Sequence, residues 1–352
     1  MDPKRSLTYR DAGVDIDSMD TALRRIAVAV RSTATPQTLS EVGSFGGMFR
    51  FPLGEWCDPV LVASVDGVGT KMKVAAAAHR FGTVGRDLVN HCVMDIFVQG
   101  ARPLFFLDYV AGEKLDPEVV ATLVDGVARG CREHGCALLG GETAEMPGVY
   151  APGEYDLAGT IVGVVERERI LDGRAGPPGR RVEPGDILIG LGSAGLHTNG
   201  YSLARKVLFE RMGLTPDSML PEAGVTVADA LLAEHRSYFA LLREPVEAGD
   251  VRALAHITGG GITDNLPRVL PDGVGARIRR DSWPVPPLFR LIGREGNVPE
   301  DDQYRTFNMG IGMIVIAAAA AASRVEAGLA RAGERSWRIG EAVSGPRRVE
   351  YI

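Results

Sequence analysis

Pro59-Val-Leu-Val-Ala-Ser-Val65, followed directly by Asp66-Gly-Val-Gly-Thr-Lys71, is the stretch from which the fold of this chain is inferred. Its β-branched residues predict a buried strand, and the alanine-rich residues 72–79 that follow predict a helix. Gly67 and Gly69 lack the Cβ atoms that would keep a phosphate away from backbone N–H groups, and a helix start adds a partial positive charge. The pattern therefore predicts a phosphate loop, although a tight structural turn would give the same sequence.

The polar residues of this stretch suit phosphate and metal chemistry. Asp66 ends the predicted strand and is expected to bind magnesium, while Thr70 and Lys71 offer a hydroxyl and a cation to phosphate oxygens. The loop is not a P-loop, which has four residues between its glycines.

The composition excludes several classes of protein. The chain has 352 residues, enough for two domains, with 45% hydrophobic and 24% charged residues and a net charge of -6. This charge argues against nucleic-acid and membrane partners. The longest apolar run, 309–322, falls short of the roughly 20 residues of a membrane helix. Four cysteines without a CxxC pair indicate reduced thiols in a cytoplasmic protein and no cysteine–histidine zinc site.

Residues 83–99 predict a helix with two stripes. One stripe is apolar, and a neighbouring polar stripe contains Asp87, His91 and Asp95 at four-residue spacing. A polar stripe on a helix is often a solvated face. This one has few long charged side chains, which favours a wall of a functional site. Both interpretations remain open from the sequence.

Further along, Asp116 and Pro117 predict the start of a helix that ends at Gly135. A short strand, 136–139, is expected to open into Gly140-Gly-Glu-Thr-Ala-Glu-Met146, which would place Glu142 and Glu145 at a strand exit. Carboxylates at strand exits are common metal ligands, but a surface turn would look similar. The polar residues 6–20 predict either a disordered end or a tail that folds over a ligand.

Residues 173–181 form the clearest linker, which predicts a domain boundary. The expected domains are 1–170 and 183–352, with a linker at 171–182. Beyond the linker, a strand leads into a glycine-rich loop that carries His197 and Asn199, and a later strand leads into Gly259-Gly-Gly261, a second anion-binding candidate. Strands and helices are mixed without strict alternation, so the predicted fold class is α+β.

The simplest hypothesis from these residues is ATP with magnesium in one domain and a phosphorylated substrate in the other. Five ordered stretches make the chain similar to the phosphoribosylformylglycinamidine cyclo-ligase family of purine biosynthesis. They are Asp66–Lys71, Gly140–Gly148, Gly195–Leu203, His256–Ile262 and Tyr304–Gly310.

The resemblance implies that ATP phosphorylates the formamide oxygen of formylglycinamidine ribonucleotide, after which ring closure releases phosphate and gives aminoimidazole ribonucleotide and ADP. It also implies a homodimer whose N-terminal domains pair into a β-barrel, a C-terminal α/β sandwich domain, and an N-terminal tail that covers the nucleotide. The residue roles that it implies are catalysis by His197, Asp66 and Asp95; magnesium binding by Asp66, Asp95 and Glu142; ATP binding by Gly67, Gly69, Thr70, Lys71, Asp87, Asn90 and Thr143; and substrate binding by Asn199, Gly259, Gly260 and Gly261.

Two positions depart from the family pattern. Met94 stands where asparagine is usual, so a hydrogen bond is expected to be lost, and Arg102 reverses the charge of the usual glutamate. Related enzymes of the same superfamily, such as thiamine monophosphate kinase and selenophosphate synthetase, and a nucleotide-binding regulatory dimer without turnover are the rival interpretations.

Overall fold

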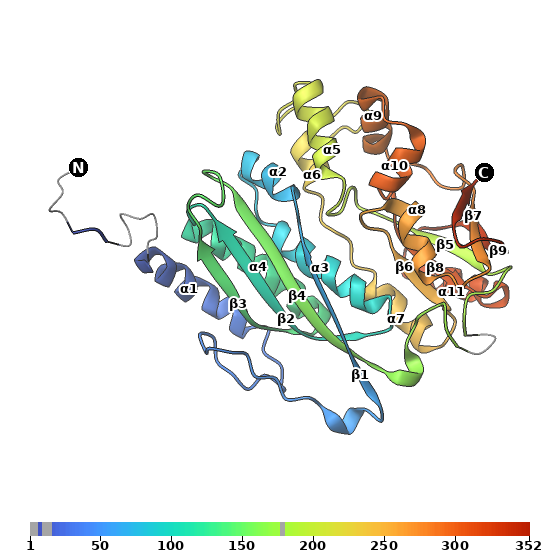
Figure 1. Cartoon of the computed structure of the whole chain (residues 1–352), viewed down its shortest axis with the longest axis horizontal. Coiled ribbons are helices and arrows are strands. Elements are labelled where there is room, and N and C mark those ends of the chain that lie inside the picture. The colour runs from blue at the N-terminus through green and yellow to red at the C-terminus, as the bar shows by residue number, and fades with distance from the viewer. Residues whose placement is uncertain (1–5, 9–15, 177–179) are drawn as a thin grey trace.

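The computed structural model contains two β-sheets that belong to two domains, with helices packed on both (Figure 1). It describes residues 6–8, 16–176 and 180–352, and it describes no side chains for 16–23. The expected N-terminal tail therefore lies largely outside the described residues. Across the described residues, no helix combines the length and the apolar character needed to cross a membrane. The mixed α+β class predicted from the sequence is confirmed.

The N-terminal domain begins with one helix and then forms a four-stranded sheet in the order β1-β4-β2-β3. Strands β2 and β3 are parallel, and the other pairs are antiparallel. The elements are α1 (Ile16–Arg31), β1 (Pro59–Gly67), α2 (Lys71–Ala77), α3 (Val84–Phe97), β2 (Arg102–Gly112), α4 (Pro117–His134), β3 (Ala137–Glu145) and β4 (Tyr155–Glu166), with short 3-10 turns at Leu53–Glu55 and Arg167–Arg169.

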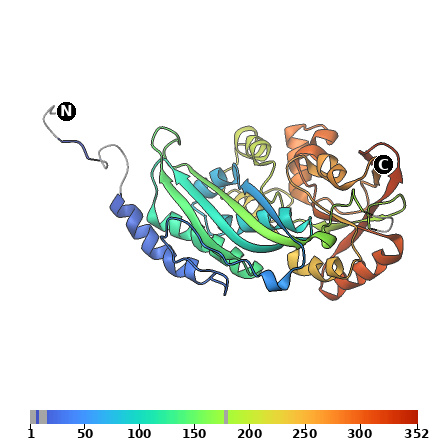
Figure 2. The same ribbon diagram turned by 60° about the horizontal axis from the view of Figure 1, so that its bottom comes forward.

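Among the described residues, helices cover only one face of this sheet. Helix α3 packs on β1, β4 and β2, α4 packs on β2 and β3, and α1 lies against α4 (Figure 2). On β1, Val62 points to the helices and is buried, whereas its neighbour Leu61 is exposed, as the two-residue period of a strand requires. Val65 and Leu107 also face away from the helices and are exposed. The sheet thus keeps one open, partly apolar face.

Helix α4 has the bounds that its local signals predict. The Asp116 Oδ1 accepts a hydrogen bond from the Glu118 N–H at 2.8 Å, and Pro117 occupies the first helical position. The helix ends at Gly135, whose φ of 65° is the left-handed conformation that glycine adopts without strain.

Strand β3 corrects one prediction. It does not end at residue 139 but continues through the two glycines to Glu145, because β2 supplies hydrogen-bonding partners along its whole length. Gly141 is required there, since a Cβ would lie 1.9 Å from the Asp108 Oδ1. Glu142 therefore belongs to a strand and not to a strand exit.

The C-terminal domain contains a six-stranded sheet in the order β10-β7-β9-β5-β8-β6. Strand β8, which lies between β5 and the edge strand β6, is buried along its whole length, and α11 packs on β5, β8 and β9. The elements are β5 (Ile187–Gly192), α5 (Tyr201–Arg205), the π-helical turn η4 (Lys206–Arg211), α6 (Val227–Leu231), α7 (Phe239–Glu247), β6 (Ala253–His256), α8 (Gly261–Asn265), η5 (Leu266–Val269), β7 (Val274–Ile278), α9 (Pro287–Gly296), α10 (Glu300–Thr306), β8 (Ile311–Ala317), α11 (Ala319–Arg331), β9 (Ser336–Ser344) and β10 (Val349–Tyr351).

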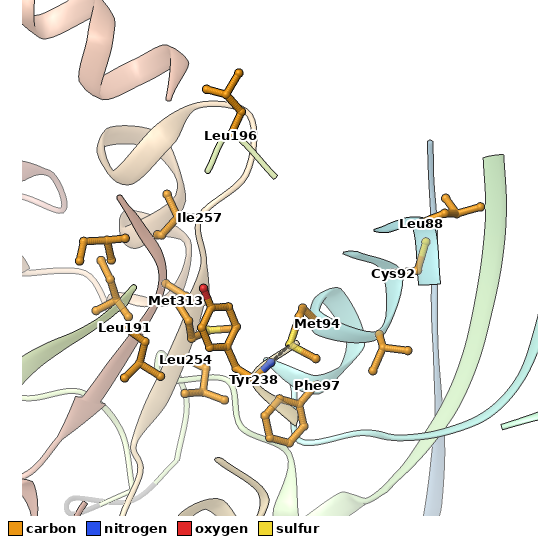
Figure 3. Packing of buried hydrophobic residues seen from close by; sticks show 14 of the residues in the cluster. Leu88, Cys92, Met94, Phe97, Leu191, Leu196, Tyr238, Leu254, Ile257 and Met313 are labelled. Carbon is orange, nitrogen blue, oxygen red and sulfur yellow. Dashed lines mark hydrogen bonds between the residues drawn. The ribbon is translucent and has the colours of Figure 1, made fainter. Parts of the chain in front are cut away.

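Helix α3 lies between the first sheet and the C-terminal domain, and side chains from both domains meet beside it (Figure 3). Phe97 packs edge-on against Phe239, with ring centroids 4.9 Å apart. The Tyr238 N–H donates to the Met94 Sδ at 3.2 Å. Met94 therefore still accepts a hydrogen bond, although a thioether is a weak acceptor.

Candidate active site between the domains

The polar stripe of α3 faces the C-terminal domain. Asp87 and His91 are buried, and Asp95 keeps a side-chain exposure of 24%. Each of the three has a partner from the second domain, more than 100 residues away along the chain. The interpretation of this stripe as a solvated face is therefore wrong.

At one end of the stripe, Lys71 and Asp87 form an ion pair that solvent does not reach. The Lys71 Nζ lies 2.6 Å from the Asp87 Oδ2, and both side chains have an exposure of 0%. The same ammonium group donates to the carbonyl oxygens of His197 at 3.1 Å and Ala233 at 2.9 Å. The remaining Asp87 oxygen accepts the His235 N–H at 2.6 Å. Three donors of one ammonium thus have three acceptors.

Asn90 continues this closed network. Its Nδ2 donates to the His235 carbonyl at 2.7 Å, and its Oδ1 lies 2.9 Å from the His134 Nε2. The polar side-chain groups of Lys71, Asp87 and Asn90, which were predicted to contact the nucleotide, instead join the two domains in this structure. The sequence could not show this, since the partners are distant along the chain.

The other end of the stripe is more open. The His91 Nε2 lies 2.7 Å from the Asp66 Oδ2 and 3.6 Å from the Asp95 Oδ2, so one imidazole stands beside two carboxylates. Asp66 keeps a side-chain exposure of 43%. Burial is the largest single influence and would raise the pKa of the Asp66 carboxyl, but the hydrogen bond and charge of His91 and the hydrogen bond from the Gly67 N–H together outweigh it, so the pKa is lowered. Both carboxylates predicted from the sequence thus occupy one site.

His256 connects Asp95 with the second domain. Its Nδ1 lies 2.8 Å from the Asp95 Oδ1, and its Nε2 lies 3.3 Å from the Nε2 of His235. Burial would raise the pKa of Asp95, but the hydrogen bond and charge of His256 lower it below its usual value. Ser64 also donates to Asp95, at 3.2 Å.

His197 lies in the same buried group, with its ring centroid 4.0 Å from that of His235. Its Nε2 accepts the Ala194 N–H at 3.2 Å, so the proton of the neutral imidazole is on Nδ1. That Nδ1 has no hydrogen-bond partner among the described residues. Burial lowers the pKa of His197 well below its ordinary value, and the neighbouring cations lower it further. His197 is therefore a neutral donor.

The glycine turn before α2 has a smaller role than predicted. The Gly67 N–H donates to the Asp66 Oδ1 at 2.7 Å and so fixes this carboxylate. Gly69 is exposed, with a φ of 52°, and the Thr70 Oγ1 lies 3.2 Å from the Ser202 Oγ. The turn therefore directs Asp66 toward α3; Gly69 is exposed, and Gly67 and Thr70 are partly exposed.

Glu142 and Thr143 lie on the far edge strand, β3. In the sheet, Asp66, Gly159, Asp108 and Gly141 form one row across four strands. Three strand spacings put Gly141 about 14 Å from Asp66. Because side chains alternate along a strand, Glu142 points to the open face, away from the helices and from Asp66. The prediction that Glu142 shares one metal ion with Asp66 and Asp95 of the same chain is therefore wrong.

Asn199 and the Gly259 turn are brought together as predicted. A Cβ on Gly259 would lie 3.1 Å from the Asn199 Oδ1. Gly260 and Gly261 have positive φ values of 99° and 58°, and a Cβ on Gly261 would lie 2.0 Å from the Tyr304 carbonyl oxygen. The side chain of Asn265 holds the turn through the carbonyl oxygens of Gly259 and Gly261.

Sequence reasoning assigned no role to His235 and His256, and it named His91 only as a member of a stripe. Four of the six histidines of the chain converge here, each with no more than 6% exposure. His256 had a detectable signal, because it ends strand β6 and only two residues separate it from three consecutive glycines. His235 lies in the polar loop after α6, where no motif marks it. The sequence indicated no cysteine–histidine zinc site and gave no sign of a cluster of histidines alone, yet His197, His235 and His256 each present a ring nitrogen within 4.8 Å of the others.

Comparison with known proteins identifies both domains. Residues 56–165 match the family model for the N-terminal domain of AIR synthase related proteins, and residues 183–352 match the model for the C-terminal domain. Phosphoribosylformylglycinamidine cyclo-ligase of Geobacter sulfurreducens is 51% identical over 352 residues, which cover 99% of each chain. The relative of the same name from Sorangium cellulosum is 51% identical over 341 residues and 96% of each chain.

Solved structures share the fold at lower identity. The thiamine-monophosphate kinase of Stenotrophomonas maltophilia is 17% identical, with a TM-score of 0.63 over 94% of this chain and 95% of that one. The hydrogenase maturation protein HypE in complex with ATP is 20% identical, with a TM-score of 0.64 over 92% of this chain and 88% of that one.

Proposed function

Because the chain belongs to the phosphoribosylformylglycinamidine cyclo-ligase family, we propose that its interdomain site converts formylglycinamidine ribonucleotide and ATP into aminoimidazole ribonucleotide, ADP and phosphate. In the first step, the formamide oxygen attacks the γ-phosphorus of ATP and ADP leaves. In the second step, an amidine nitrogen attacks the activated carbon, phosphate leaves, and a proton is lost from the ring. Most of the work of the protein is then positioning and charge stabilisation, as in other phosphoryl transfers.

One observation carries the proposal: the open carboxylates of the first domain meet the histidines of the second. The 2.8 Å contact between Asp95 and His256 joins the two halves, and Asp66 remains accessible beside it. A reaction with two substrates benefits from a site to which both domains contribute, because each domain can orient one reactant.

His197 suits the role of a donor better than that of a base. Its free Nδ1–H can stabilise an oxygen that gains negative charge during phosphoryl transfer or ring closure. Its lowered pKa keeps the imidazole neutral near pH 7, so it donates a hydrogen bond without bringing a positive charge.

Asp66 and Asp95 fit a hard divalent cation. Their lowered pKa values keep both groups ionised, and carboxylate and hydroxyl oxygens are the ligands that magnesium prefers. Magnesium bound here would neutralise phosphate oxygens of ATP. The proposed ion is held by Asp66 and Asp95 alone, because Glu142 of the same chain points to the opposite face of the sheet.

The proposed division of the chain is 1–170 for ATP binding and dimerisation, a linker at 171–182, and 183–352 for the phosphate of the substrate. Gly69, Thr70 and Thr143 remain proposed contacts of ATP. Asn199 and Gly259–Gly261 remain proposed contacts of the substrate phosphate, supported by their proximity and by the backbone N–H groups of the turn.

We also propose a homodimer that covers the open face of the first sheet. Val65 is 69% exposed and Leu61 62% exposed on the edge strand β1, and such apolar positions favour pairing with a second copy. Glu142 shares this face, so it would lie near the subunit interface. Size-exclusion chromatography with light scattering tests the proposal. The wild-type protein should have the mass of a dimer, and Val65→Lys should have the mass of a monomer. A variant that keeps the mass of the dimer would contradict the proposed interface.

The four unpaired thiols support a cytoplasmic location.

The reaction is tested by supplying formylglycinamidine ribonucleotide, ATP and magnesium without glutamine or ammonia and following aminoimidazole ribonucleotide. His197→Ala should lower turnover at least about tenfold, because a donor to a developing charge is lost. Wild-type turnover in this variant would remove His197 from the mechanism. Nucleotide binding without product from the wild-type protein would support a regulatory dimer instead.

A further inference from the structure

Beside the oxygen-lined half of the site lies a group of buried imidazoles that the proposed reaction uses only in part. His197, His235 and His256 have exposures of 1%, 1% and 6%. Their ring nitrogens lie within 4.8 Å of one another, and they come from three separate segments of the C-terminal domain. Three imidazoles form a donor set of a different kind from the carboxylates of Asp66 and Asp95, because nitrogen ligands suit zinc and similar transition metals.

The hydrogen bonds fix the tautomers of two of these rings. The Nδ1 of His235 lies 3.0 Å from the Arg236 carbonyl oxygen, which can only accept, so this nitrogen carries the proton. The Nδ1 of His256 donates to the Asp95 carboxylate at 2.8 Å. In the neutral rings, both Nε2 atoms therefore carry lone pairs, and these atoms are 3.3 Å apart. Two facing lone pairs at this distance repel each other unless a proton or a metal cation lies between them.

A metal ion satisfies this arrangement in its geometry. Zinc–nitrogen bonds of about 2.0–2.1 Å at a tetrahedral angle separate two ligand nitrogens by roughly 3.3–3.4 Å. The two Nε2 atoms already have this separation. Asp95 accepts the outer N–H of His256, which is the usual second contact of a zinc-binding histidine.

We propose that His197, His235 and His256 form a binding site for a transition-metal dication of the zinc class, adjacent to the magnesium site and separate from it. His197 would bind through its unpartnered Nδ1, with the proton moved to Nε2 and the contact with the Ala194 N–H given up. A water would complete the tetrahedron. Burial and the neighbouring cations lower the pKa of His197 and His235, which favours the neutral form of the ring that binds metals.

One consequence rests on the proposed function. A metal on the Nδ1 of His197 would remove the free N–H that the reaction needs, so zinc should inhibit turnover. Metal binding itself is measured without ATP or ribonucleotide. A failure of the metal site and a failure of the proposed reaction are therefore distinguishable.

The test uses the full-length protein, freed of metal with a chelator and titrated with Co²⁺ in the presence of excess Mg²⁺. Tetrahedral coordination gives visible absorption bands, and Zn²⁺ should abolish them at about one ion per chain. His235→Asn removes the Nε2 ligand and retains a donor for the Arg236 carbonyl, so it should weaken binding roughly tenfold or more. The matched control is His79→Asn at an exposed histidine with a φ of 50°, a conformation that asparagine tolerates, and it should bind as the wild type does.

Two results would overturn the proposal: no visible bands in the wild-type protein, or equal affinity in the wild type and His235→Asn. Circular dichroism establishes that the variant is folded. If His235→Asn does not fold, His235→Gln takes its place in the same comparison, and the wild-type spectrum still decides whether a site exists.

Discussion

The two ends of the polar stripe on α3 carry similar residues in opposite surroundings. At the Asp87 end, every polar atom of the Lys71 ammonium and the Asp87 carboxylate has a partner, and solvent reaches neither side chain. At the Asp95 end, the carboxylates keep some exposure, and the Nδ1–H of His197 has no hydrogen-bond partner in the part of the chain that the structure describes. Asp87 and Asp95, eight residues apart on one helix, thus have different roles. The difference is whether all polar atoms around the carboxylate are already paired within the protein or some are left for a ligand.

The largest effect is expected from removing the Lys71–Asp87 ion pair at the buried, fully paired end of the stripe, called the closed end below. Lys71→Met leaves the Asp87 carboxylate buried without its counter-ion, and the free energy of unfolding should fall by about 3–5 kcal/mol. Urea titration measures this loss. The double variant Lys71→Met/Asp87→Leu should recover part of it, because the uncompensated charge is gone. If Lys71 served only to bind phosphate, Lys71→Met would instead leave the free energy of unfolding unchanged and weaken ATP binding.

The next effect concerns pH at the closed end. Burial lowers the pKa of His134 from 6.5 to about 4, so as pH falls below 6.5 the unfolded chain binds this proton before the folded one does. The stabilising contribution is complete above pH 6.5 and is lost toward pH 4, up to about 3 kcal/mol. His134→Gln can still bond to Asn90 and should show a shallower loss of unfolding free energy over this range. Equal pH slopes for both proteins would contradict the assignment.

At the open end, Asp66→Asn should affect turnover more than stability. It removes one charge from the proposed magnesium site, so turnover should fall at least about tenfold, an effect of about 1.4 kcal/mol. The magnesium concentration required for half-maximal rate should rise. The unfolding free energy should change by less than about 1 kcal/mol, because the side chain is 43% exposed. A stability loss as large as that of Lys71→Met would mean that the two ends do not differ.

The smallest effect comes from an ion pair outside the stripe. Arg102 lies 2.7 Å from Glu55 and stacks over Trp56, with about half of both charged side chains exposed. Arg102→Gln should cost less than about 1 kcal/mol of unfolding free energy, because solvent screens the pair. Turnover should remain at the wild-type rate. A clear loss of turnover would show that this departure from the family pattern bears on function.

The sequence predicted elements whose signals are local. Asp116, Pro117 and Gly135 set the bounds of α4, because a cap and a left-handed glycine act within a few residues. The short strands β7 and β10 were not predicted: turn signals precede both, but runs of five and three residues show no clear period of their own, and each strand is defined by its neighbour in the sheet. The extension of β3 through Gly140 and Gly141 likewise depends on pairing with β2.

The same limit applies to the site. Asp66 and Asp95 could be predicted as site residues from local signals: Asp66 from its position at the end of a strand, and Asp95 from the four-residue spacing of the polar stripe. The role of Lys71 could not, because its acceptors lie 126 and 162 residues further along the chain. Glu142 was misplaced because the continuation of β3 decides which face of the sheet it occupies.

The buried contacts along α3 also limit how substrates enter. Opening a hinge between the domains would expose the Lys71–Asp87 pair and the Phe97–Phe239 contact at once. Such an excursion is rare on the time scale of turnover, because a buried charge would need to be hydrated each time. For the proposed reaction we therefore expect reactants to enter past the exposed residues Asp66 and Gly69, with their exchange controlled by surface loops and not by separation of the two domains.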